Sequence, residues 1–262
     1  MGLNRTRIAV ACALWLAAGA SAHAANLPAC AGGVEIARAR VVRVEQNGVL
    51  VLADGRALIL EGIRLPMGEA DHAATRLAEE ARSSLLTMAR SGTITGTAIP
   101  PKQDRYDRVR VQAFSDNQWL QRTLLVQGLA RVSISPDRVE CAADFYEFEK
   151  DARTAGRGIW AIPAYRVRTD RDDWHPDIGT FQLIEGKVAR VTTRDGDTVL
   201  DFSSDGRSGL KAVISGADRR KFRSGLLEEL AGHRLRLRGI VQESGGRPMI
   251  AVSNLEQIQL LD

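Results

Sequence analysis

Apolar and polar residues alternate in short runs between Val41 and Pro66, the most strongly patterned stretch of the chain. Strand-forming residues in runs of three or four, separated by turn residues, predict short β-strands. The predicted strands cover 42–45, 49–52 and 58–60. Asn47-Gly48 and Asp54-Gly55 lie between them, and these residue types tolerate the positive φ of tight hairpins. The stretch therefore predicts a curled meander, which is how a small five-stranded barrel begins.

The pattern then changes to a spacing of three and four residues. Asp71 to Arg90 carries apolar residues on one face and charged residues on the other, which predicts a helix. Further strands are expected at 93–99 and 109–113, and further helices at 121–127 and 144–154. Gly128 follows the first of these two helices as its expected C-cap.

The second half of the chain returns to strand patterns after a charged segment, 165–178, that we interpret as a linker. From Gly179 the predicted order is three strands, a helix over 217–230, and two strands. That order is typical of an OB-like barrel. The predicted fold class is mainly β with α (α+β): a five-stranded OB-type barrel with helices, followed by a second OB-like barrel.

Length and net charge say less about the fold and function than the pattern of apolar and polar residues does. The 262 residues favour two domains, and 44% hydrophobic and 26% charged residues are ordinary for globular proteins. The formal charge is +4. Arg5 and Arg7 precede an apolar run, and Ala22-His23-Ala24 fits a signal-peptidase site. Residues 1–24 are therefore predicted to be a signal peptide, which implies a periplasmic or secreted protein without a transmembrane segment after its removal. Losing both arginines lowers the charge to +2, which is weak support for nucleic-acid binding.

Two cysteines, Cys30 and Cys141, remain after the predicted cleavage. In an oxidising compartment they form an expected disulfide, which would close a loop of about 110 residues and contribute up to ~4–5 kcal/mol on the chain-entropy model. Two buried free thiols are the alternative. Two cysteines without a nearby pair of histidines are poor zinc ligands.

The loop from Lys102 to Arg110 is the most basic segment of this half. Arg105 and Arg108 flank Tyr106, and such a loop can grip phosphates and stack a base. The alternative is a solvated loop in which Asp104 and Asp107 neutralise the arginines.

Several segments together resemble the staphylococcal nuclease-like (thermonuclease) family. The two hairpins end in Gly62-Ile63 followed by Pro66, where that family shows Arg-Leu-x-Gly-Ile-Asp-x-Pro-Glu. Further matches are Asp104-Arg105-Tyr106-Asp107-Arg108, Leu124-Leu125-Val126 with Gly128-Leu129-Ala130, and Gly158-Ile159-Trp160. The resemblance covers 34–163. It implies a nuclease in which two acids and a backbone carbonyl hold Ca²⁺, arginines contact the phosphate, and a Glu positions water, while Tyr106 and Arg108 contact the nucleotide.

Most of these catalytic positions differ in this chain. Carried across, the hairpin acid falls on Asn47 or Gly48, and the second acid falls on Arg64. The first Arg falls on Ile59 and the Glu falls on Met67, so only Arg108 is retained. Because Ca²⁺ needs several oxygen ligands and Met cannot act as a base, we expect no cofactor and no hydrolysis by that mechanism.

Two other acidic groups are weaker candidates for a rearranged site. Glu61 and Glu69 lie near the lost positions, but solvated loop carboxylates are the simpler interpretation. In the second half, Asp195-Gly196-Asp197-Thr198 spells the nuclease hairpin, but Asp-Gly is also the commonest hairpin turn. The stripe Arg234, Arg236 and Arg238 is either a track for a phosphate backbone or an exposed strand face.

These observations predict a nuclease-like domain over 25–164, the linker, and an OB-like domain over 179–262. The favoured function is a catalytically inactive binding module whose partner is single-stranded nucleic acid or an envelope protein. The first alternative is an active phosphodiesterase with a rearranged site. The second is a structural protein-interaction module.

Overall fold

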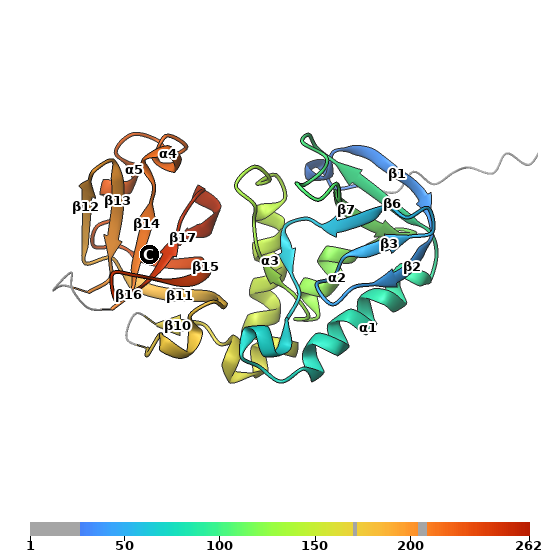
Figure 1. Cartoon of the computed structure of the whole chain (residues 1–262), viewed down its shortest axis with the longest axis horizontal. Helices are drawn as coiled ribbons and strands as arrows, with labels where there is room; N and C mark the ends of the chain where they lie inside the picture. The colour runs from blue at the N-terminus through green and yellow to red at the C-terminus, as the bar shows by residue number, and fades with distance from the viewer. Residues whose placement is uncertain (1–26, 170–171, 204–208) are drawn as a thin grey trace, which may run out of the picture.

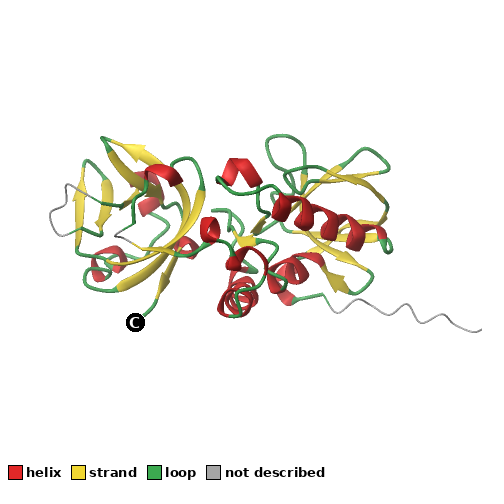
Figure 2. Ribbon diagram, turned by 90° about the horizontal axis from the view of Figure 1, so that it is seen from below, coloured by secondary structure: helices red, strands yellow, loops and turns green. Residues whose placement is uncertain are grey.

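The computed structural model describes residues 27–169, 172–203 and 209–262. The predicted signal peptide lies outside them. The described residues form an α+β protein with two mixed β-sheets at opposite ends and helices between them (Figures 1 and 2). Each sheet has its own cluster of buried apolar side chains. We call the parts around the first and second sheets the first and second domains. The α+β class is confirmed, and the exact domain boundaries stay a prediction.

The first sheet has the strand order β1-β6-β7-β4-β3-β2, with β8 paired to β7. Its strands are β1 (Gly33–Ala39), β2 (Val41–Val44), β3 (Leu50–Leu52), β4 (Ala57–Leu60), β6 (Ile94–Ala98), β7 (Val109–Ser115) and β8 (Gln118–Trp119). The two predicted hairpins are confirmed as β2-β3 and β3-β4. The strand pairs form an open path among the described residues, where we expected a closed barrel. The end strands β1 and β2 are joined by the chain at Arg40 and not by a ladder of hydrogen bonds.

Three helices cover this sheet: α1 (Arg76–Arg90), α2 (Leu120–Val126) and α3 (Ala142–Thr154). The helix α1 begins later than predicted because Gly68–Asp71 forms a separate 3₁₀ turn. In that turn the carboxylate of Asp71 accepts the backbone N–H of Met67 at 2.8 Å. A separate two-stranded sheet, which we call the small sheet, pairs β5 (Ile63–Arg64) with β9 (Arg131–Val132). These two short strands lie on the side that faces the second domain.

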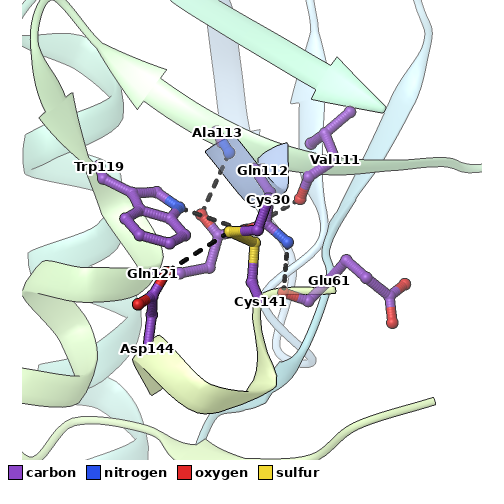
Figure 3. Close-up of a disulfide and its surroundings, with 9 residues drawn as sticks. All are labelled: Cys30, Glu61, Val111, Gln112, Ala113, Trp119, Gln121, Cys141 and Asp144. Atoms are coloured by element: carbon purple, nitrogen blue, oxygen red, sulfur yellow. Dashed lines mark hydrogen bonds between the residues drawn. A yellow bond between two sulfur atoms is a disulfide. The ribbon is translucent and has the colours of Figure 1, made fainter. Parts of the chain in front are cut away.

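The expected disulfide between Cys30 and Cys141 is confirmed. It joins the segment before β1 to the start of α3, and Figure 3 shows it beside a buried amide network. In this network Gln121 accepts the N–H of Ala113 and donates to the carbonyl of Val111, at 3.1 and 2.8 Å. Buried polar groups of the backbone are thereby satisfied where β7 meets α2.

The second sheet has the order β10-β11-β15-β16-β14-β13-β12, with β17 paired to β15. Its strands are β10 (Arg168–Thr169), β11 (Phe181–Lys187), β12 (Arg190–Arg194), β13 (Asp197–Asp201), β14 (Lys211–Ile214), β15 (Arg234–Ser244), β16 (Arg247–Ala251) and β17 (Ile258–Leu260). The helix expected over 217–230 is instead two short helices, α4 (Gly216–Arg219) and α5 (Leu226–Glu229). Six 3₁₀ turns complete the described elements: Ala29–Ala31, Gly68–Asp71, Gly158–Ala161, Pro163–Tyr165, His175–Asp177 and Leu255–Gln257. This sheet also forms an open path among the described residues.

The segment that we interpret as a linker packs on the second domain. Trp174 belongs to the second apolar cluster, and Arg168 pairs with the buried Asp177 at 2.6 Å. The strand β10 in this segment runs parallel to β11. The segment therefore extends the second sheet before Gly179.

Helix α3 lies between the two sheets and contacts the second domain (Figure 1). Its Glu149 accepts two hydrogen bonds from Arg238 of β15, at 3.3 and 3.0 Å, and both side chains are 1% exposed. Its Tyr146 donates to the backbone carbonyl of Glu256. From the 3₁₀ turn His175–Asp177, between β10 and β11, the carbonyl of Pro176 accepts from the ring of His72. The two domains thus share a buried polar interface.

Candidate functional site

The basic loop 102–110 leads into β7 and is organised by Asp104. Its carboxylate accepts the backbone N–H groups of Tyr106 and Arg108, at 2.9 and 3.0 Å. It also accepts Nε and Nη2 of Arg108, at 2.9 and 2.6 Å. Asp107 has a φ of 58°, which an aspartate tolerates and which turns the chain back toward the sheet. The local sequence therefore fixes both the shape of the loop and the direction of Arg108.

The loop presents an exposed aromatic ring among cations. Tyr106 is 60% exposed. The guanidinium carbons of Arg105 and Arg108 lie 4.8 and 5.0 Å from the centre of its ring, within the range of cation–π contacts. The structure thus brings together the three residues that the sequence analysis assigned to nucleic-acid binding.

Charge in this loop is only partly neutralised. Arg108 pairs with Asp104, and Lys102 pairs with Glu35 of β1 at 2.5 Å. Among the described residues, Arg105 and Asp107 form no ion pair. Burial opposes ionisation of Asp104, but its hydrogen bonds from Arg108 and Tyr106 prevail and lower the pKa of its carboxyl group. The alternative in which Asp104 and Asp107 neutralise the basic residues of the loop therefore holds, within the described residues, only for Arg108, because Lys102 pairs with an acid outside the loop.

The turn to which the resemblance assigns the first metal-binding acid is packed against an apolar side chain. Gly48 has a φ of 83°, and a Cβ atom added there would lie 2.0 Å from Cδ1 of Leu65. Leu65 is buried in the first apolar cluster. The hairpin is closed by the bond from Gly48 N–H to the carbonyl of Glu45, whose side chain pairs with Arg43. An apolar side chain therefore lies against the turn at which the resemblance places an acid.

Arg64 and Met67 have structural contacts of their own. The guanidinium of Arg64 lies 5.9 Å from the ring centre of Phe181 in the second domain. The backbone N–H of Met67 is held by Asp71, which also receives Nη2 of Arg131 at 2.9 Å and the hydroxyl of Tyr165 at 3.2 Å. Burial, and then the charge of Asp71, raise the pKa of Tyr165 above its usual range. None of these groups offers a set of free oxygen ligands, so the residues present do not fit a Ca²⁺ ion.

The two acids considered for a rearranged site lie apart. Glu61 is buried, accepts Nε of Arg110 and the hydroxyl of Ser135, both at 2.7 Å, and lines a small polar cavity near the disulfide. Glu69 is exposed and lines a different cavity, beside Met67. In residues 27–169, 172–203 and 209–262, no group of three or more His, Cys, Asp or Glu could hold a metal ion. Asp195 and Gly196 form the turn between β12 and β13, as their hairpin signal predicts.

Sequence reasoning missed the ionic contacts that join elements far apart in the chain. Arg110 pairs with Asp137 as well as Glu61, and the hydrogen bond from Arg110 lowers the pKa of Asp137 despite its partial burial. The arginine stripe on β15 is neither free nor fully exposed, because Arg236 pairs with Glu185 and Arg238 with Glu149. For one such contact, the pair of Arg131 with Asp71, the sequence held a partial signal, because Arg131 interrupts the apolar run from Leu129 to Val132.

Comparison with known proteins identifies part of the first domain. Residues 57–162 match the protein family described as Staphylococcal nuclease homologue. The match begins at Ala57, so it includes the positions of Ile59, Arg64, Met67 and the basic loop but not the Asn47-Gly48 turn. No curated protein matches the chain.

Proposed function

We propose that this chain, whose first domain is staphylococcal nuclease-like over residues 57–162, binds single-stranded nucleic acid and has lost the calcium-dependent hydrolysis of that family. In this proposal both sheets derive from OB-type barrels, and the second domain is OB-like. The observation that carries the proposal is the exposed ring of Tyr106, which lies within cation–π distance of the guanidinium groups of Arg105 and Arg108.

This arrangement suits unpaired bases. Bases stack on aromatic rings and on guanidinium planes, and arginines neutralise the phosphates beside them. Arg105 has no carboxylate partner among the described residues, so its charge is available to a phosphate. Asp104 holds Arg108 in place through two side-chain hydrogen bonds, which lowers the entropy cost of binding.

The proposed loss of hydrolysis follows from the side chains that stand at the positions of the family's metal site. Leu65 packs against Gly48, Arg64 replaces an acid, and Met67 replaces the residue that positions water. A positive charge and two apolar side chains cannot bind a divalent cation or accept a proton.

A rearranged phosphodiesterase finds little support in the contacts of Glu61. Arg110 and Ser135 occupy its two carboxylate oxygens, and Asp137 holds the same arginine from the other side. A base must reach its water or substrate proton, and this carboxylate is committed to its neighbours.

The binding experiment measures fluorescence anisotropy of short labelled single-stranded DNA and RNA with the oxidised chain from Ala25 to Asp262. We expect salt-sensitive binding that Tyr106→Ala weakens about five- to hundredfold, because stacking contributes ~1–3 kcal/mol per base. Arg105→Ala should reduce the salt slope by about 1. The control is Lys150→Ala, which changes an exposed lysine on α3 that, within residues 27–169, 172–203 and 209–262, pairs only with Glu147. Equal binding by wild type and Tyr106→Ala would refute the role of the loop.

A second experiment tests catalysis with the same chain, with Ca²⁺ or with chelator. We expect no hydrolysis of either nucleic acid. Calcium-dependent cleavage that disappears in Arg108→Ala would overturn the proposed loss of activity and favour the phosphodiesterase. If the folded chain neither binds nor cleaves, an envelope protein becomes the partner to test.

The proposed location is the periplasm or the cell exterior. The disulfide supports this location, because structural disulfides persist in oxidising compartments. Within the described residues, no helix is long and apolar enough to cross a bilayer. Detection of the chain in periplasmic or culture fractions, shortened at Ala24, would test the location.

A further inference from the structure

A cleft of about 260 Å³ lies between the two domains. The first domain contributes Arg64 and Ser133, and β15 of the second contributes Arg238, Ile240 and Gln242. The ring of Phe181, at the start of β11, forms part of the wall beneath Arg64. The described residues that line the cleft include two arginines and no acid. Because Arg238 pairs with Glu149, Arg64 supplies the unpaired positive charge of the cleft within the described residues.

The charge of Arg64 has no counterpart within the described part of the chain. Its neighbour across the small sheet is Arg131, another cation. The buried acid that pairs with Arg131, Asp71, also accepts the hydroxyl of Tyr165 and the N–H of Met67. Arg64 thus lies half-buried beside a like charge, and charges in such positions are normally paired.

Unused hydrogen-bond donors lie at the same place. Nε of Arg64 and Nε of Arg238 are buried without a partner among the described residues. Arg238 is 1% exposed and its other two nitrogens bind Glu149 and the carbonyl of Val132, so its side chain is held rigidly. Buried donors of this kind are usually satisfied by water or by a ligand.

We propose that this cleft between the domains binds a small oxyanion, a phosphate or carboxylate group, through Arg64. The planar guanidinium presents paired N–H donors that match both groups. The hydroxyl of Ser133 and the amide of Gln242 are further polar groups of the lining. The exposed side chain of Ile240 provides an apolar wall for whatever carries the anion.

The size of the cleft limits the ligand. Its volume of about 260 Å³ is below that of pockets for drug-sized ligands, ~300–1,000 Å³. A single oxyanion group with a small substituent fits this space. The proposal is independent of the basic loop, because it needs neither Tyr106 nor nucleic acid.

The test uses isothermal titration calorimetry on the oxidised chain at constant ionic strength, with inorganic phosphate in one arm and succinate in the other. Saturable binding of either probe is expected, and the better probe identifies the phosphate or carboxylate source. Arg64→Met should weaken binding about tenfold or more, the loss of a charge-assisted hydrogen bond. The matched control is Arg43→Met, an exposed arginine of β2 that should bind like wild type.

A second variant guards against a folding defect. Arg64→Lys keeps the positive charge but loses the paired N–H donors of the guanidinium, so its affinity should lie between those of wild type and Arg64→Met. Circular dichroism checks that each variant is folded. The proposal is overturned if wild type binds neither probe saturably, or if folded Arg64→Met binds both as tightly as wild type. The titrations contain no nucleic acid, so their result does not depend on whether the basic loop binds single-stranded DNA or RNA.

Discussion

Replacing Arg238 by Met should strongly destabilise the protein, because it leaves a buried carboxylate short of partners. Glu149 would lose hydrogen bonds at 3.3 and 3.0 Å and keep only the N–H of Val132 at 2.7 Å and a longer contact to Arg153 at 3.5 Å. Removing one member of a buried ion pair costs about 3–5 kcal/mol. That is a large part of the ~5–15 kcal/mol that keeps a typical protein folded.

The assay is equilibrium unfolding in urea, followed by circular dichroism with the disulfide intact. With slopes of ~2–3 kcal/mol per molar urea, the midpoint should fall by about 1–2 M. Arg234→Met is the matched control, because it changes the same residue type on the same face of β15 at a position that is 59% exposed. Its effect should stay within about 0.5 kcal/mol.

A double variant isolates the pair. Glu149→Gln with Arg238→Met removes both charges, so it should be more stable than Arg238→Met alone. The reasoning is refuted if Arg238→Met lowers the free energy of unfolding no more than Arg234→Met does. Burial of the arginine would then make no difference to stability.

Two further predictions concern the first domain. Reduction should lower the free energy of unfolding by up to ~4–5 kcal/mol, because Cys30 and Cys141 close a loop of 111 residues, while the Cys30→Ala/Cys141→Ala variant should show no response to reductant in urea unfolding. The pKa of Asp137 is lowered in the folded state by Arg110, so its stabilisation is present above the unfolded pKa of about 4 and is lost as pH falls through the folded value. The Tm difference between wild type and Asp137→Asn should therefore shrink from pH 6 to pH 3, and a difference that grows on acidification would contradict this sign.

The local pattern of the sequence predicted those elements whose partners are close in the chain. The hairpins β2-β3 and β3-β4 follow from two turn signals and short apolar runs. The sequence pattern did not predict strand β1, because only Ile36 of its seven residues is fully buried and its partner β6 lies far along the chain. Prediction from spacing works when a strand has one buried face, and β1 does not show one.

The candidate sites divide in the same way. Arg105, Tyr106 and Arg108 are neighbours in sequence, so their cluster was predictable from the loop alone. The period of two on β15 correctly places Arg234, Arg236 and Arg238 on one face, but it carries no information about what covers that face. Glu149 lies 89 residues away from Arg238, and only the packing of α3 against the second domain brings them together.

The interface also changes how the positions that correspond to the family's catalytic residues are understood. If these positions had merely drifted, the segment around them would be free of specific contacts. Instead Leu65 lies against Gly48, Arg64 lies 5.9 Å from the ring centre of Phe181, and Asp71 accepts the backbone N–H of Met67 while it binds Arg131. Arg131 in turn donates to the backbone carbonyl of Phe181. The segment between β4 and α1 therefore supports the second domain, and an acid at position 64 would face the aromatic ring of Phe181. This segment now stabilises the contact between the domains, which is why we assign ligand binding to the basic loop and to the cleft and not to the family's metal site.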